Sequence, residues 1–134
     1  MISLTRIATD ESDAGSSSIG AVAAQPKCYA LTVFTQQFRE VRDFYVDILG
    51  ADVVTENSGK ACELELGGMP LCFRQAEHGE MVSYFHLHLA LRNPEAVLTE
   101  LRRRGIIVTS VGPFTNFRDP EGRVIKLSEG RVSL

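Results

Sequence analysis

One order of strand and helix patterns occurs twice along this chain, at a spacing close to half of the folded length. In the first half, an alternating strand pattern at 29–35 precedes an amphipathic helix pattern at 37–50, and three short strand-like segments follow. The same order begins again at 84–91. Gly50 and Gly105, which end the two helix patterns, lie 55 positions apart. The repeat predicts two similar modules, each able to bury only one face of a small sheet under its helix.

This repeat predicts an α+β fold of two βαβββ modules. Two such modules form a curved mixed sheet with the helices outside and a concave cup left open, a shape that favours small molecules. Residues 9–26 are rich in Ser, Ala, Gly and Asp and lack periodicity, as flexible segments do. We therefore expect a flexible arm at 1–26 and a single domain at 27–134, with modules at 27–80 and 81–134. The remaining strands are expected at 51–56, 61–66, 70–75, 106–111, 114–118 and 124–129.

The composition restricts the partners that this chain is expected to have. The 134 residues are 44% apolar and 23% charged, and the formal net charge is −3. Such a charge gives no broad attraction to nucleic acid or to an anionic membrane, and no apolar run is long enough to cross a bilayer. Three cysteines without a C-x-x-C spacing favour reduced thiols and a cytoplasmic location.

Three stretches of the sequence carry a resemblance to a known family. They are "FREVRDFYVDILGADV" in the first half, and "HLHLALRNPEAVLTELRRRGI" and "FRDPEGRVIKLSE" in the second. Together they resemble the glyoxalase / bleomycin-resistance / extradiol-dioxygenase superfamily, also called the vicinal oxygen chelate superfamily, over about 28–130. The resemblance implies the two-module fold with its cup, and a homodimer in which both chains build the pocket.

Metal-using members of that superfamily place four ligands in the cup. Carried over to this sequence, the four positions hold Ala30, Cys72, His86 and Lys126. Ala30 has no donor atom, and a protonated Lys126 would repel a divalent cation. Catalytic zinc needs about three protein ligands. We therefore expect no cofactor and no complete metal site.

A site with two histidines is the alternative for a divalent metal. In "YFHLHLAL", strand alternation places His86 and His88 on the cup face, with Cβ atoms roughly 7 Å apart. A metal held by both would take Cys72 as its third ligand, or Glu63 or Glu65 if the hairpin twists differently. Without a metal, the two histidines line the pocket and form hydrogen bonds with their neighbours.

The same alternation predicts which side chains line the cup. A neutral His86 could remove a proton from a bound ligand, with Lys126 or Arg74 stabilising the oxyanion, so His86 and Lys126 are the candidate catalytic residues. The predicted ligand-binding residues are Thr32, Phe34, Cys72, Arg74, His86, His88 and Lys126, and the wider lining adds Cys28, Ala30, Val124 and Ser128.

Two classes of function follow from these residues. The first is a protein like the bleomycin-resistance branch, which binds a small aromatic or anionic molecule without a complete metal site. The alternative is a lyase, isomerase or ring-cleaving dioxygenase that uses an altered metal site or His86 and Lys126.

Overall fold

The computed structural model describes residue 20 and residues 22–130, so most of the predicted arm (1–26) lies outside the described residues. Within them the two predicted βαβββ modules are confirmed. The first consists of β2 (Leu31–Thr35), α1 (Phe38–Asp47), β3 (Asp52–Asn57), β4 (Ala61–Leu66) and β5 (Met69–Gln75). The second consists of β6 (His86–Leu91), α2 (Glu95–Arg103), β7 (Thr109–Val111), β8 (Phe114–Arg118) and β9 (Val124–Glu129).

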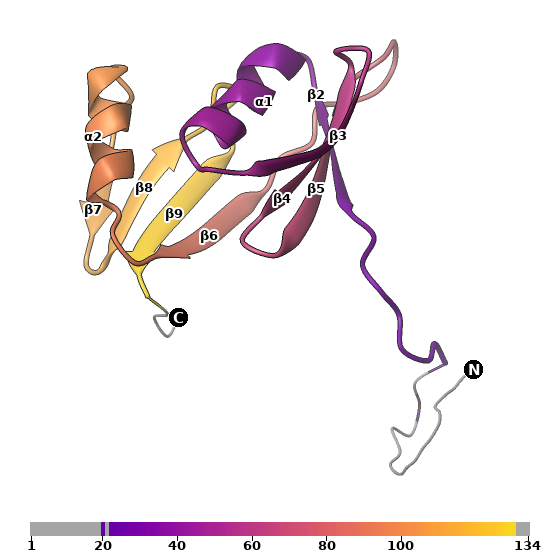
Figure 1. Cartoon of the computed structure of the whole chain (residues 1–134), viewed down its shortest axis with the longest axis horizontal. Helices are drawn as coiled ribbons and strands as arrows, with labels where there is room; N and C mark the ends of the chain where they lie inside the picture. Colours follow the sequence, from indigo (N-terminus) through magenta and orange to yellow (C-terminus); the bar gives the residue numbers. More distant parts are fainter. Residues whose placement is uncertain (1–19, 21, 131–134) are drawn as a thin grey trace.

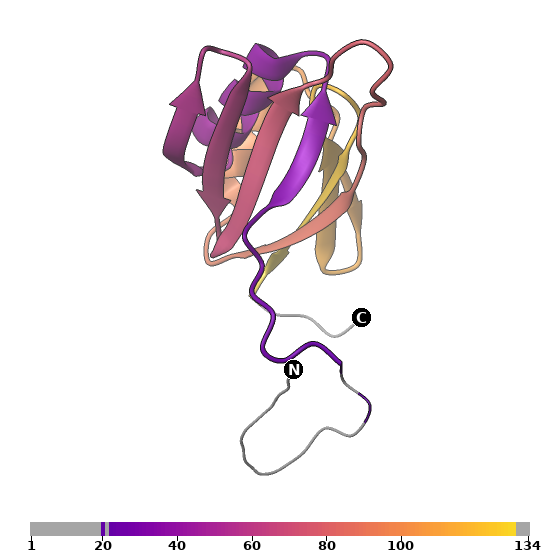
Figure 2. The same cartoon turned by 90° about the vertical axis from the view of Figure 1, so that its right-hand side faces the viewer.

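Each module forms its own four-stranded mixed sheet (Figures 1 and 2). The strand orders are β2-β5-β4-β3 and β6-β9-β8-β7, so β2 and β6 are corresponding edge strands. In each sheet the first strand pairs parallel with the last and the other pairs are antiparallel. The α+β class and its curved sheets are therefore confirmed. Neither helix of the described residues is long and apolar enough to span a membrane.

Helix α1 packs against the buried faces of both sheets. The ring of Tyr45 lies 4.8 Å from that of Phe73 on β5 and 6.3 Å from that of Phe85, which precedes β6. The ring of Phe44 lies 6.1 Å from that of Phe117 on β8. Figure 1 shows α1 between the two sheets, and Figure 2 shows the first sheet in front of both helices. Each sheet therefore has a second face, away from α1, which we call its open face.

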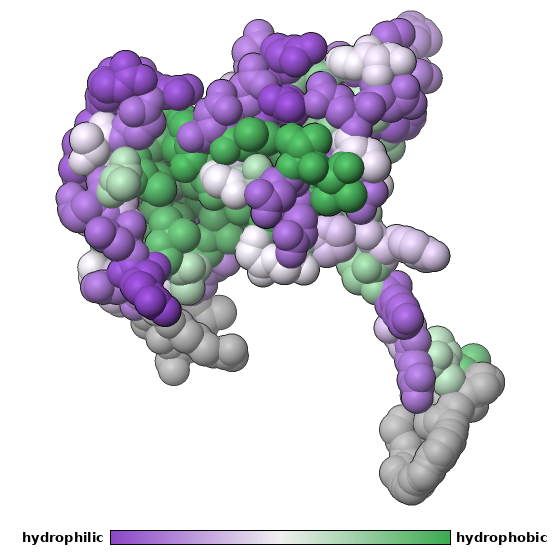
Figure 3. Space-filling model, viewed as in Figure 1, coloured by the Kyte–Doolittle hydropathy of each residue, from purple (hydrophilic) through white to green (hydrophobic). Residues whose placement is uncertain are grey.

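Alternation along the strands sorts the side chains between these two faces. Leu71 and Phe73 of β5 are fully buried, whereas Cys72 between them is only partly buried on the open face. Leu64, on the neighbouring β4, is also fully buried and pairs with Leu71. Figure 3 shows apolar surface gathered between the two helices, beside the shared core. The core therefore fixes which side chains remain for the open faces.

A buried arginine joins the two modules. Arg123, only 1% exposed, follows the turn between β8 and β9. Its guanidinium lies 3.1 Å from Asp119 Oδ2 and 2.9 Å from Glu121 Oε1. It also donates to the carbonyls of Ser83, at 2.7 Å, and Phe34, at 2.9 Å. The charged groups of Arg123, Asp119 and Glu121 are therefore paired although their side chains are at most 5% exposed.

The two carboxylates extend this cluster into the first module. Tyr45 of α1 donates to Asp119 Oδ2 at 2.8 Å. Thr35 donates to Glu121 Oε1 at 2.5 Å, and the Gln36 N–H donates to Glu121 Oε2 at 2.8 Å. Burial, and then the charge of Asp119, raise the pKa of Tyr45 far above its ordinary value. Burial alone would raise the pKa of Glu121, but these hydrogen bonds and Arg123 outweigh it and lower that pKa.

Replacing Arg123 by Met is expected to destabilise the fold strongly. Two buried carboxylates would lose their cation, and breaking a buried ion pair costs about 3–5 kcal/mol. Urea unfolding measures the loss in the free energy of unfolding. The control, Arg103→Met, removes an ion pair on the exposed face of α2 and should cost less than about 1 kcal/mol. Equal losses in the two variants would contradict a joining role for Arg123.

The lowered pKa of Glu121 predicts a loss of stability in acid. The folded state binds fewer protons than the unfolded chain below the ordinary carboxyl pKa of 4.5. The contribution of Glu121 is therefore fully present above that pKa and is lost as the pH falls through the lower, folded-state pKa. In Glu121→Gln, urea unfolding between about pH 5 and pH 3 should show a smaller pH dependence than in the parent protein. An unchanged slope would contradict the assignment, and Glu40→Gln, at an exposed position, is the control.

Candidate functional site

The open face of the second sheet carries the two histidines. His86 and His88 are exposed on β6, whereas the leucines between and after them are only partly exposed. In the pairing of β6 with β9, Val124 lies opposite His86 and Lys126 lies opposite His88. The strand register therefore places Lys126 directly beside His88, one step along the sheet from His86.

His88 is held by its neighbours on this face. Its Nε2 lies 2.8 Å from Ser128 Oγ, and the Ser128 hydroxyl donates to the Gly130 carbonyl at 2.8 Å. The Phe114 ring meets the His88 ring edge-on at 5.4 Å. Lys126 Nζ lies 4.6 Å from the centre of the same Phe114 ring, a cation–π contact. A histidine and an ammonium group are thus fixed beside each other.

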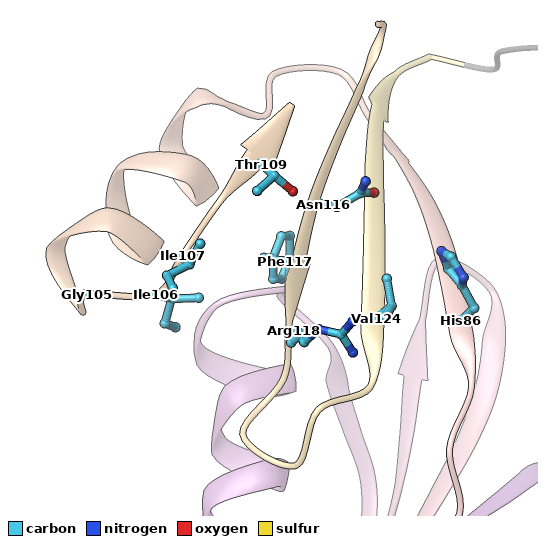
Figure 4. Close-up of a pocket in the computed structure, with 9 residues that line it drawn as sticks. All are labelled: His86, Gly105, Ile106, Ile107, Thr109, Asn116, Phe117, Arg118 and Val124. Atoms are coloured by element: carbon cyan, nitrogen blue, oxygen red, sulfur yellow. The ribbon is translucent and has the colours of Figure 1, made fainter. Parts of the chain in front are cut away.

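A cavity of about 650 Å³ opens beside His86 (Figure 4). It is lined entirely by residues of the second module. Its apolar part includes Ile106, Ile107 and Val124, and Ile107 is 80% exposed. Its polar part includes Asn116 and Arg118 beside His86. Such a mixture of an apolar wall and a few polar groups is typical of small-molecule sites.

Asn116 contributes a buried polar atom without a partner, among the described residues, to the lining of this cavity. Its Oδ1 is buried and has no hydrogen-bond partner among residue 20 and residues 22–130. The register places Asn116 beside Lys126 on β9 and beside Thr109 on β7. A buried amide oxygen without a partner costs about 1–3 kcal/mol, so a ligand that donates a hydrogen bond there would remove this cost.

The charges on this open face have one sign. Lys126 and Arg118 face outward here, and the Arg118 guanidinium donates to the Gly122 carbonyl at 2.8 Å. The open-face positions of β6, β7, β8 and β9 carry no Asp or Glu. Without an opposing carboxylate, the two cations favour an anion at this surface.

The remaining predicted residues lie on the open face of the first sheet. Thr32 pairs with Cys72, and Phe34 pairs with Arg74. The Arg74 guanidinium stacks 4.7 Å from the Phe34 ring centre, and its Nη2 lies 2.6 Å from Glu80 Oε2. The predicted ligand-binding residues therefore lie on two sheets: Thr32, Phe34, Cys72 and Arg74 on the first, and His86, His88 and Lys126 on the second.

The comparisons with known proteins identify the family. The family model described as a glyoxalase-like domain matches residues 30–128. The chain belongs to the family of glyoxalase-like domains. No curated protein matches the sequence. The glyoxalase-like assignment confirms the resemblance to the vicinal oxygen chelate superfamily.

Solved structures of similar fold come from several bacteria. The fosfomycin resistance protein FosX of Listeria monocytogenes, in a hexagonal crystal form, has a TM-score of 0.63 and 14% identity, over 81% of this chain and 96% of that one. A possible glyoxalase of Bacillus cereus has a TM-score of 0.61 and 14% identity, over 74% and 95%. A lactoylglutathione lyase of Agrobacterium tumefaciens has a TM-score of 0.56 and 16% identity, over 78% and 95%. At these identities the likeness concerns the fold.

The positions carried over from the family for metal ligands lie on different sheets of this glyoxalase-like domain. Among the described residues, no group of three or more His, Cys, Asp or Glu side chains could hold a metal ion. Cys72 lies beside Glu63 on the first sheet, whereas His86 lies on the second. The four positions carried over from the family therefore do not fit a metal in the single chain.

Sequence reasoning missed several residues of the cavity. The sequence pattern "FTNFR" predicts a strand but does not show which strand pairs with it. Its antiparallel pairing with β9 places Asn116 and Arg118 on the same face as Lys126. Ile106 and Ile107 were expected in a strand, whereas β7 begins at Thr109 and leaves both in the loop beside the cavity. Alternation along "FTNFR", combined with this pairing, is the signal that could have found the polar pair.

Replacing Asn116 by Leu is expected to stabilise the ligand-free protein by about 1 kcal/mol. The substitution keeps a similar volume and removes a buried oxygen that has no partner within the described part of the chain. The free energy of unfolding in urea measures the change. Thr109→Val, at the neighbouring position of β7, is the control for a general effect of apolar substitution on this face. A loss of stability in Asn116→Leu would show that the amide already has a partner.

Proposed function

We propose that this glyoxalase-like domain binds a small anionic molecule on the open face of its second sheet. The observation that carries the proposal is the pair of cations, Lys126 and Arg118, beside a cavity of about 650 Å³, on a face where the described strand positions carry no Asp or Glu. The anionic group lies near the cations, and an apolar or aromatic part packs on Ile106 and Ile107. The resemblance to the bleomycin-resistance branch of the superfamily implies binding of this kind.

A homodimer completes the pocket in this proposal. The open face of the first sheet carries three carboxylates, Asp52, Glu63 and Glu65, on β3 and β4. Its charge is opposite to that of the second open face, so the two faces of different protomers are complementary. The edge strands β2 and β6 each pair with another strand on one side only. Tyr29, just before β2, is 93% exposed, and a partner protomer would cover it.

In the dimer, the partner's first sheet brings Thr32, Phe34, Cys72 and Arg74 to the side of the ligand opposite His88. The proposed binding needs no metal, although FosX of Listeria monocytogenes has been crystallised with Mn(II). A cytoplasmic location is part of the proposal, supported by three unpaired cysteines. The second candidate function is proton-transfer catalysis of a lyase or isomerase kind. It is favoured by the hydrogen bond that orients His88.

Benzoate, which is both anionic and aromatic, is a suitable probe for the proposed site. Titration into ¹⁵N-labelled protein is expected to shift the amide signals of β8 and β9. Lys126→Gln should weaken binding roughly tenfold, because one charge-assisted contact is lost. The control is Arg103→Gln, on α2 and away from the site. This variant has the same net charge as Lys126→Gln and should bind benzoate with the affinity of the parent protein.

The titration is run with a chelator and then with Mn(II) in place of the chelator. Similar affinities in the two conditions support binding without a metal, and a strong dependence on Mn(II) contradicts it. Shifts confined to other surfaces, equal weakening in both variants, or no binding would contradict the proposed site. Sedimentation of the same samples tests the homodimer.

A further inference from the structure

The hydrogen bonds of Ser128 fix which nitrogen of a neutral His88 carries the proton. A carbonyl oxygen can only accept, so the contact with Gly130 O uses the single hydrogen of the Ser128 hydroxyl. Ser128 Oγ must then accept in its contact with His88 Nε2, and the proton between them belongs to the imidazole. The neutral ring is thus protonated at Nε2, and its lone pair is on Nδ1.

We infer that His88 presents Nδ1 as the proton acceptor for a weakly acidic hydroxyl group, such as that of a phenol or an enol. Ser128 is 2% exposed, so water competes little for its hydrogen bonds, whereas the His88 ring is exposed to a ligand. Within the described part of the chain, Nδ1 has no hydrogen-bond partner. Ser128 is a positioning residue that acts through His88.

Lys126 provides the charge that such a proton transfer needs. Its Cα is the pairing partner of His88 across β6 and β9. The O–H bond of the ligand breaks, its electron pair stays on the oxygen, and Nδ1 receives the proton. The resulting oxyanion lies between the imidazolium and the Lys126 ammonium, on a face where the described strand positions carry no Asp or Glu. Both charges that form are therefore compensated inside the site.

The inference rests on the proposed function, because both use the open face of the second sheet, but its first test needs no ligand. Long-range ¹H–¹⁵N correlation spectra, recorded where the rings are neutral, distinguish the two tautomers of each histidine. We expect His88 to be protonated at Nε2, Ser128→Ala to give a mixture of tautomers, and Ser128→Thr to restore the single form. His78→Gln, in a loop away from this face, identifies the His78 signals. A His88 protonated at Nδ1, or one unaffected by Ser128→Ala, overturns the inference.

The second test uses 4-nitrophenol, whose phenol and phenolate differ in visible absorbance. Binding should raise the phenolate fraction at fixed pH and shift the His88 Nδ1 signal. His88→Gln should weaken this effect roughly tenfold, and Ser128→Ala should weaken it less. No effect of 4-nitrophenol, or an effect kept in His88→Gln, overturns the acceptor role. If benzoate binds while the tautomer prediction fails, only this inference is wrong; if the tautomer is as expected and benzoate does not bind, the proposed function is wrong.

Discussion

The buried Arg123 is the interaction on which the arrangement of the two modules depends. It compensates two carboxylates, Asp119 and Glu121, which in turn accept hydrogen bonds from Tyr45 of α1 and Thr35 of β2. Removing two carboxylates from water is costly unless each oxygen is paired. The second module therefore supplies the charged turn, and the first supplies the hydroxyl donors. Neither module alone contains all the hydrogen-bond partners that the buried groups need.

The buried cluster around Arg123 determines which faces of the two sheets can bind a ligand. By holding α1 against both sheets, it buries the inner face of each sheet and leaves the other face open. The second open face has Lys126 and Arg118 and a cavity beside them, whereas β4 of the first sheet carries Glu63 and Glu65 on its open face. Opposite charges on separate faces favour contact between two protomers over a site closed within one. The position of α1 therefore determines which sheet faces can form the proposed pocket.

The sequence was sufficient for features that depend on local periodicity. The half-length repeat predicts the two modules, and alternation along β6 separates His86 and His88 from the leucines between them. Features that depend on strand pairing could not be predicted in the same way. The sequence predicts His86 and Lys126 as the catalytic pair, but only the register shows that Lys126 lies directly opposite His88. The burial of Arg123 was also missed, because a charged residue in a turn gives no local sign of distant partners.

Strand register also limits the shape of the ligand. His88, Lys126, Asn116 and Thr109 are successive neighbours on β6, β9, β8 and β7, and so form one row across the sheet. Neighbouring strands lie about 4.8 Å apart, so the row is roughly 14 Å long. It offers an imidazole, an ammonium, an amide and a hydroxyl in that order. A flat ligand lying along this row would place an acidic hydroxyl at His88 and a hydrogen-bond donor at Asn116 Oδ1. Its negative charge would then lie between them at Lys126, and this order of groups follows from strand pairing alone.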